Sequence, residues 1–168
     1  FLIDSLVKLS RLENGILQLA PQEEALKPML TRAVKETESK ARAKGLELIL
    51  HDMDEKAYFD SKWTLEAICN ILDNAVKYTN EGSISLYVTA YEMFVRIDIK
   101  DSGIGIKEEE LSKIFSRFYR SEDTKNMEGV GIGLYLSRQI ISGEGGYIKV
   151  SSVYGQGSTF SVFLPRSA

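Results

Sequence analysis

The segment EAICNILDNAVKYT, residues 66–79, constrains the fold more than any other part of the chain. At about 100° of rotation per residue on a helix, its apolar and polar side chains separate onto two faces. The apolar face comprises Leu65, Ile68, Leu72, Ala75 and Val76. Such a face must pack against another layer of structure, so the sequence predicts a core helix with one polar side.

Four polar residues share the other face of this helix within about a quarter-turn, namely Glu66, Asn70, Asn74 and Lys77. Carboxamides and an amine in line suit a metal ion with a polyphosphate, because Mg²⁺ prefers oxygen ligands and shares them with phosphate. Most polar helix faces are merely solvated, so the helix alone leaves a ligand site and a wet surface as equal alternatives.

The 168 residues, 43% hydrophobic and 27% charged, suffice for one substantial domain with a short appendage. A net charge of −3 argues against a nucleic-acid groove or a polybasic membrane patch. No apolar run is long enough to span a bilayer, and no signal peptide is visible. The single cysteine, Cys69, excludes an internal disulfide, fits a reducing compartment and is interpreted as a packing residue.

Residues 1–16 repeat apolar side chains at the spacing of a helical bundle, at Leu2, Leu6, Leu9, Leu12 and Ile16. This helix begins without a cap, which predicts that the chain is cut from something longer. Residues 17–25 contain Pro21 and are predicted to be a linker or an edge strand. Residues 26–168 are then left for the globular domain.

Helices are predicted over 26–44, ended by Gly45, over 66–79, capped by Asp60 or Ser61, from 107, and over 132–142. Strands are predicted over 46–50 and 56–59, and as hairpins over 83–91 with 93–101 and 147–153 with 158–164. This pattern predicts an α+β two-layer sandwich, in which one mixed, mostly antiparallel sheet is covered on one face by helices.

The first glycine-rich loop, DSGIGI (101–106), directly follows a predicted strand. Its glycines allow the backbone to approach a flat ligand closely. An aspartate at the strand end, Asp101, can accept a hydrogen bond from an exocyclic amine, the donor that marks adenine. Such turns are common, so by itself this loop favours an ordinary turn.

The second glycine-rich loop, EGVGIGLYLS, places Gly129, Gly131 and Gly133 at the start of a helix. Successive free N–H groups at a helix start form an anion site, whereas the alternative is a flexible hinge. Glycines that alternate immediately before an amphipathic helix favour the anion site.

Between these loops lies KIFSRFYRSEDTKN, which combines aromatic and basic residues. Phe115, Phe118 and Tyr119 are predicted to pin the segment to the domain, and Arg117 and Arg120 to reach phosphate. The charged tail that follows is predicted to be a lid. A later GQGSTF (155–160) alone predicts only a hairpin turn.

The order of these motifs strongly resembles that of the catalytic ATP-binding domain of two-component sensor histidine kinases. The motifs are, in order, N-x-x-x-N-A-x-K-Y, D-x-G-x-G, the aromatic–arginine segment, G-x-G-x-G-L and G-x-G-S-T-F. These kinases share an ATPase superfamily, with the Bergerat-type fold, with gyrase and the heat-shock chaperones. The resemblance covers nearly the whole chain, because LVKLSRLENG is similar to the end of the second helix of the kinase dimerisation domain.

The resemblance implies a role for each matching residue. Asn74 would coordinate Mg²⁺ with help from Asn70, Lys77 would contact phosphate, Tyr78 would pack on adenine, and Asp101 would accept from its amine. The base pocket would be completed by Gly103, Gly105, Ile106 and, behind a water, Thr159. Gly129, Gly131, Gly133 and Leu134 would hold the triphosphate under the lid, and Arg117 or Arg120 would assist. The other residues implied to bind the nucleotide are Phe115, Phe118, Val130 and Ile132.

The implied reaction transfers the γ-phosphoryl group of ATP to a neutral histidine, which requires no strong base from this chain. The implied partners are the protein's own dimerisation domain and a response regulator, in a homodimeric parent at a bacterial inner membrane with this part in the cytoplasm. The family's acceptor motif, a histidine followed by an acidic residue, is absent. The only histidine, His51, lies in the wrong context and is predicted to be structural.

Two further departures concern Glu144, which replaces the usual histidine before the last glycine pair and is expected to border the site with little effect, and a short lid. Alternatives also stay open. A gyrase-like ATPase would carry a glutamate where Asn70 stands, and an amide cannot take up a proton; Glu66 is the only candidate substitute. A non-catalytic ATP-sensing module is a second alternative. A serine kinase is disfavoured by residues 1–16.

Overall fold

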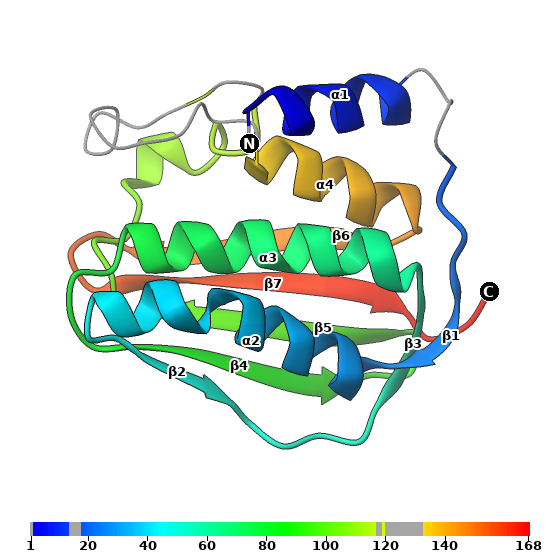
Figure 1. Cartoon of the computed structure of the whole chain (residues 1–168), viewed down its shortest axis with the longest axis horizontal. Coiled ribbons are helices and arrows are strands. Elements are labelled where there is room, and N and C mark those ends of the chain that lie inside the picture. The colour runs from blue at the N-terminus through cyan, green and yellow to red at the C-terminus, as the bar shows by residue number, and fades with distance from the viewer. Residues whose placement is uncertain (1, 14–17, 117–118, 120–132) are drawn as a thin grey trace.

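The computed structural model describes residues 2–13, 18–116, 119 and 133–168. Helices α2 (Leu26–Ala43), α3 (Ser61–Lys77) and α4 (Gly133–Gly143) form one layer over a sheet, and α1 (Leu2–Glu13) lies along α4 at the edge of that layer (Figure 1). None of the described helices combines the length and apolarity that crossing a bilayer requires.

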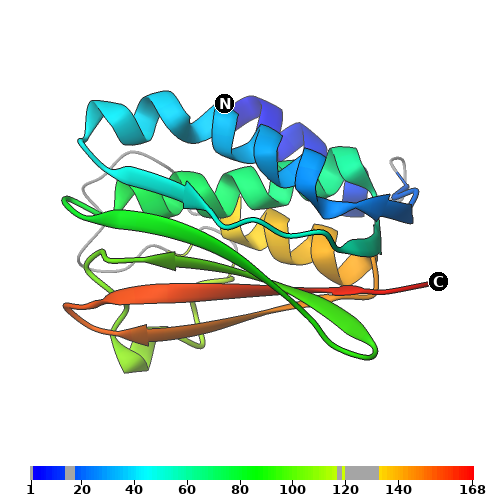
Figure 2. The ribbon, with the colours of Figure 1, turned by 90° about the horizontal axis from the view of Figure 1, so that it is seen from below.

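The main sheet has five strands in the order β2 (Glu47–Leu50), β4 (Ser83–Ala90), β5 (Phe94–Asp101), β7 (Gly157–Pro165) and β6 (Tyr147–Val153). Only β2 and β4 pair in parallel, and the other pairs are antiparallel. The helices lie on one side of this sheet (Figure 2), so the predicted two-layer α+β sandwich is confirmed. Strands β1 (Gln22–Ala25) and β3 (Lys56–Phe59) pair separately, so the predicted edge strand does not join the main sheet.

Helix α3 begins at Ser61, five residues earlier than the predicted segment, because Asp60 caps it. The Asp60 carboxylate accepts from the backbone N–H groups of Lys62 and Trp63, both at 3.1 Å, and so satisfies donors that a helix start leaves unpaired. Most of the predicted apolar face of this helix is buried, with Ile68 and Leu72 wholly inaccessible and Leu65 half-buried.

Helix α2 follows the predicted range closely and ends where a glycine can reverse the chain. Gly45 has φ of 71°, and its N–H and that of Leu46 donate to the last carbonyls of the helix. The predicted short helix after Lys107 is reduced to a single 3₁₀ turn, Glu108–Glu110.

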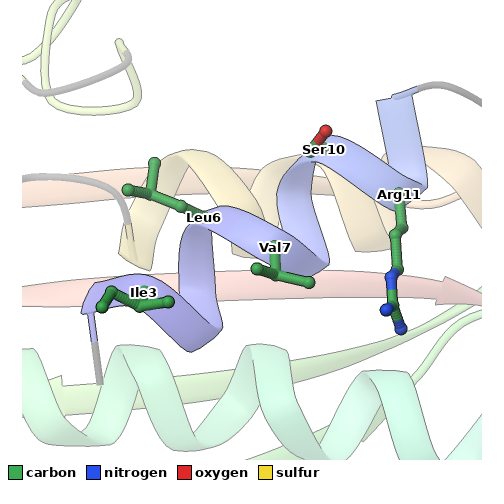
Figure 3. Close-up of a pocket in the computed structure, with 5 residues that line it drawn as sticks. All are labelled: Ile3, Leu6, Val7, Ser10 and Arg11. Carbon is green, nitrogen blue, oxygen red and sulfur yellow. The ribbon is translucent and has the colours of Figure 1, made fainter.

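Among the side chains of helix α1 that the structure describes, Leu9 is buried in the core at 2% exposure, and Lys8 pairs with Glu66 of α3. The outer side of α1, Ile3, Leu6 and Val7, is exposed and lines a shallow pocket together with Ser10 and Arg11 (Figure 3). The side chains of Leu2 and Leu12, and the whole of Ile16, are not among the parts that the structure describes.

A buried carboxylate, Glu144, joins the end of α4 to the start of α3. It is 5% exposed and accepts from the Asp60 backbone N–H at 2.7 Å and from the Thr64 hydroxyl at 2.8 Å. Asp60 in turn accepts from the backbone N–H of Ala20, in the linker from α1, at 2.8 Å. Glu144 therefore lies at the opposite end of α3 from Tyr78, so it fixes the helix start and does not border the residues expected to bind a ligand.

Burial raises the pKa of Glu144 from 4.5 to about 7, although its hydrogen bonds oppose the shift. The unfolded chain therefore loses this proton at lower pH than the folded one, and the free energy of unfolding falls as pH rises between these values, by on the order of 3 kcal/mol. We expect the Glu144→Gln variant to lack this pH-dependent fall in the free energy of unfolding. Between pH 4.5 and 7.5 its free energy of unfolding relative to that of the native protein should therefore rise by on the order of 3 kcal/mol.

Urea unfolding at a series of pH values measures this difference directly. The exposed Glu92→Gln variant is the matched control and should track the native protein throughout. A Glu144→Gln difference that does not change with pH would contradict the assignment.

Candidate functional site

Segments far apart in the sequence meet at the C-terminal end of α3. The backbone N–H of Ile104, in the loop after β5, donates to the Tyr78 carbonyl at 3.1 Å. The Ile104 carbonyl accepts from Gly155, in the β6–β7 turn, at 2.6 Å, and the hydroxyl of Ser152 accepts from the Ile106 N–H at 2.7 Å. The loop 101–106 is therefore held between the end of α3 and the end of the sheet.

Asp101 lies at the centre of this junction and is 9% exposed. Its Oδ1 accepts from the backbone N–H groups of Gly103 at 2.9 Å and Ser158 at 3.3 Å. Burial raises the pKa of Asp101, and these two hydrogen bonds oppose the rise. Among the residues that the structure describes, no donor reaches Oδ2, so this oxygen is left to accept a hydrogen bond from a ligand.

The glycines of the loop are required by close packing. A Cβ on Gly103 would lie 2.5 Å from the Tyr78 carbonyl oxygen and 2.8 Å from the Thr79 hydroxyl. Gly105 has φ of 74°, and a Cβ there would collide with the Val153 carbonyl. Both glycines therefore let the loop lie directly on neighbouring backbone, and Ile106 beside them is half-buried against the core.

Of the polar face predicted for α3, Glu66 pairs with α1 and Asn70 lies against α4. The Asn70 amide nitrogen donates to the Gly133 carbonyl at 3.5 Å, and the buried Ser137 hydroxyl donates to the same carbonyl at 2.9 Å. Asn74 and Lys77 follow on successive turns and are half-buried, with the Lys77 ammonium 6.0 Å from the centroid of the Tyr78 ring. Asn70 is thus positioned beside the start of α4.

In the part of the chain that the structure describes, no three acidic, histidine or cysteine side chains gather into a group able to hold a metal ion. The oxygen donors on this face are the neutral carboxamides of Asn70 and Asn74. Neutral oxygens bind Mg²⁺ weakly by themselves, so a cation here needs anionic oxygens from a bound molecule.

The structure does not bring Thr159 to the pocket. In the pairing of β5 with β7, Lys100 lies opposite Thr159 and Asp101 opposite Ser158, so Thr159 shares a face with Lys100 on the other side of the sheet. Ser158 is the residue beside Asp101, and its hydroxyl lies 2.9 Å from that of Ser152. The sequence signal that could have identified Ser158 is strand alternation: Phe160 is an inward-facing core residue, and Ser158, two residues earlier, faces the same side.

Part of the predicted phosphate site and lid lies outside the described residues, namely Arg117, Phe118, Arg120, Gly129, Val130, Gly131 and Ile132. Phe115 is a core residue that packs edge-to-face on Phe160 with centroids 6.2 Å apart, in line with its predicted pinning role. Leu134 and Tyr119 are likewise packed against the core.

Other candidate groups have ordinary partners. His51 is exposed and stacks on Tyr87 with ring centroids 4.2 Å apart. Burial raises the pKa of Cys69 to about 12, and its hydrogen bond to Glu36 adds to the shift, so its thiol is unreactive at neutral pH. Glu66 forms an ion pair with Lys8 of α1 at 3.1 Å.

Comparison with known proteins gives one matching family model, described as histidine kinase-, DNA gyrase B- and HSP90-like ATPase, over residues 59–168. Curated relatives include the hybrid signal transduction histidine kinase B of Dictyostelium discoideum, 29% identical over 98% of this chain and 9% of the relative. The adaptive-response sensory kinase SasA of Synechococcus elongatus is 32% identical over 98% of this chain and 43% of the relative. The sensor histidine kinase GraS of Staphylococcus epidermidis is 33% identical over 98% and 48%. The chain spans less than half the length of each of these relatives.

Solved structures give the same fold. The Acinetobacter baumannii histidine kinase AdeS matches with a TM-score of 0.82 at 23% identity, over 99% of this chain and 77% of that chain. Full-length ShkA in complex with AMPPNP matches with a TM-score of 0.87 at 23% identity, over 99% and 36%. The catalytic domain of histidine kinase ThkA matches with a TM-score of 0.77 at 25% identity, over 89% and 99%.

The loop 101–106 packs on the β6–β7 turn, and this contact predicts that alanine lowers stability more at Gly105 than at Gly155, although both glycines have left-handed backbones. Gly155 has φ of 85° with nothing within 4 Å of an added Cβ, so Gly155→Ala should cost only the backbone penalty, about 1–2 kcal/mol. Gly105→Ala should lose clearly more stability in urea unfolding, because the Val153 carbonyl must also move. Equal losses would show that the loop does not rest on the turn.

Proposed function

This chain belongs to the family of histidine kinase-, DNA gyrase B- and HSP90-like ATPases, and from that premise we propose that it is the ATP-binding catalytic part of a sensor histidine kinase. It transfers the γ-phosphoryl group of ATP to a histidine on a dimerisation domain, for relay to a response regulator. The observation that carries the proposal is Asp101, a buried carboxylate whose Oδ1 is held by two backbone donors and whose Oδ2 remains for the adenine amine.

The base is bound at the junction of α3 with the loop 101–106. Asp101 accepts from the exocyclic amine, the Tyr78 ring packs on the adenine face, and Gly103, Gly105 and Ile106 form the wall. Guanine carries a carbonyl where adenine carries this amine, so the carboxylate also selects against GTP. A relative of the same fold, ShkA, has been solved in complex with AMPPNP, which supports a nucleotide here.

The triphosphate extends along the polar face of α3 toward the start of α4. Asn74 would coordinate Mg²⁺ directly, Asn70 would help through the metal or its water, and Lys77 would contact phosphate. When bound with the nucleotide, Mg²⁺ neutralises phosphate charge, which is most of what phosphoryl transfer requires. We assign the remaining phosphate contacts to residues 129–134, with Arg117 and Arg120.

This chain positions the phosphoryl group and leaves acid–base chemistry to its acceptor. A neutral imidazole attacks phosphorus without prior deprotonation, so Asn70 suffices where hydrolysis would need a base. We place the acceptor histidine on a dimerisation domain outside this chain. Helix α1 resembles the end of the second helix of that domain. The proposed parent is a homodimer in a bacterial inner membrane with this part in the cytoplasm, a location drawn from the family resemblance.

The competing function is an ATPase that uses Glu66 as its base. The ion pair with Lys8 opposes it, since Glu66 is drawn toward α1, and Lys8 is also paired with Asp4 at 3.1 Å. A module that binds ATP without catalysis would show binding alone, and labelling separates it from a kinase.

The proposal is tested by incubating the chain, extended upstream into its parent sequence, with γ-labelled ATP and Mg²⁺. Protein-bound label that is lost in acid and retained in base establishes a phosphohistidine. Binding of ATP without label favours the sensing module, and release of labelled phosphate without protein label favours the ATPase.

Asn74→Ala should remove the Mg²⁺-dependent part of ATP affinity while leaving the fold intact, because a half-buried amide at a helix surface contributes little to packing. Titration with ATP in the presence of Mg²⁺ and of a chelator measures this part, with the exposed Asn80→Ala variant as control. A Mg²⁺ effect that survives in Asn74→Ala would contradict the assignment.

Asn70→Glu should raise the release of phosphate from ATP, since it supplies the base that the amide cannot be. Glu66→Gln should leave the native rate unchanged. The ATPase hypothesis predicts the reverse, a native rate that falls in Glu66→Gln, and a colorimetric phosphate assay distinguishes the two.

A further inference from the structure

Thr79 lies immediately beyond the last residue of α3 and its capping residue Tyr78. Its side chain is fully buried, at 0% exposure, and its hydroxyl has no hydrogen-bond partner in the described part of the chain. Among the residues that the structure describes, no other buried side-chain nitrogen or oxygen is in this position. The other buried threonines are paired: Thr37 donates to the Ala33 carbonyl at 2.9 Å and Thr64 donates to Glu144 at 2.8 Å.

A buried hydroxyl without a partner weakens a fold, because it loses its hydrogen bonds to water and gains none in return. Valine has nearly the same shape and carries no such penalty. The hydroxyl of Thr79 therefore does not serve the stability of the domain as the structure presents it, and its use must lie in another state.

The position of the hydroxyl indicates which state that is. The point where a Cβ on Gly103 would lie is 2.8 Å from the Thr79 hydroxyl and 3.0 Å from Asp101 Oδ1. The hydroxyl and the carboxylate thus flank the same loop residue. The N–H of Ile104 bonds to the Tyr78 carbonyl, so this loop is already attached to the end of α3.

We propose that Thr79 is a positioning residue of the base pocket: when adenine binds, the side chains of Thr79 and Asp101 approach one another across Gly103, and the Thr79 hydroxyl donates a hydrogen bond to the Asp101 carboxylate. The inference rests on the proposed function, because it needs a base that Asp101 binds. A donor at the carboxylate favours its ionised form, which is the form that accepts from the amine. Binding of the base is thereby coupled to the formation of a hydrogen bond by the previously unpaired Thr79 hydroxyl.

Thr79→Val separates this role from a structural one, because the two readouts move in opposite directions. The variant should melt about 2–4 °C higher than the native protein, since the unpaired hydroxyl is gone. Its affinity for ATP and for adenosine, measured by calorimetry, should fall roughly 3- to 10-fold. Its affinity for inorganic tripolyphosphate, which does not enter the base pocket, should not change.

Two further variants complete the test. Thr79→Ser keeps the hydroxyl and should retain native affinity for ATP. Thr37→Val removes a paired hydroxyl from α2 and should melt lower than the native protein with unchanged ATP affinity.

Native ATP affinity in Thr79→Val, a melting temperature lowered as in Thr37→Val, or an equal loss for tripolyphosphate would each overturn the inference. A native protein that binds tripolyphosphate but neither ATP nor adenosine would overturn the proposed function and this inference with it. If the native protein binds ATP and the Thr79→Val variant binds it equally well, the inference alone fails and the proposed function stands.

Discussion

Hydrogen bonding between β5 and β7 places the last residue of one strand, Asp101, opposite Ser158 of the other, and the candidate site depends on that pairing. The Ser158 N–H holds the carboxylate from the sheet, and the Gly103 N–H holds it from the loop. Backbone donors have no rotamers to lose, so the carboxylate is oriented at little entropic cost. Gly157 allows the close approach, because a Cβ there would collide with the Asp101 carbonyl. The carboxylate that we propose recognises the base is therefore positioned by the sheet, and the loop adds the second donor.

Helix α3 is held at both ends, which fixes the polar face between them. Its first turn is held by Asp60 and Glu144, and its last carbonyls, those of Val76 and Lys77, accept from the Lys44 ammonium at 2.7 Å and 2.9 Å. Cations at a helix C-terminus also interact favourably with the helix dipole. Because neither end can slide, the carboxamides on the middle turns keep their position relative to α4. Rigid support of this kind is what a site for metal and phosphate requires.

Much of this arrangement follows from local sequence patterns. The amphipathic period of residues 66–79 and the hairpins predict the layers of the fold, and the roles predicted for the residues of the two glycine loops stay predictions. What local patterns do not contain are tertiary partners. The position of Glu144 beside the start of α3, the separate β1–β3 pair and the unpaired hydroxyl of Thr79 all arise from contacts between distant segments. Ser158, and not the predicted Thr159, lies beside Asp101 for a different reason. Alternate residues of a strand point to opposite faces of the sheet, and the motif G-x-G-S-T-F does not specify which of its residues faces the pocket.

The pairing of β5 with β7 also has a consequence for synthesis on the ribosome. Asp101 emerges more than fifty residues before Ser158, the donor that secures it. Until β7 appears, β5 lacks one of its two neighbours and the carboxylate lacks its donor from the sheet. Contacts of such long sequence separation form late and slowly. The nascent domain therefore completes the setting of the Asp101 carboxylate, and with it the proposed nucleotide pocket, only when β7 is in place.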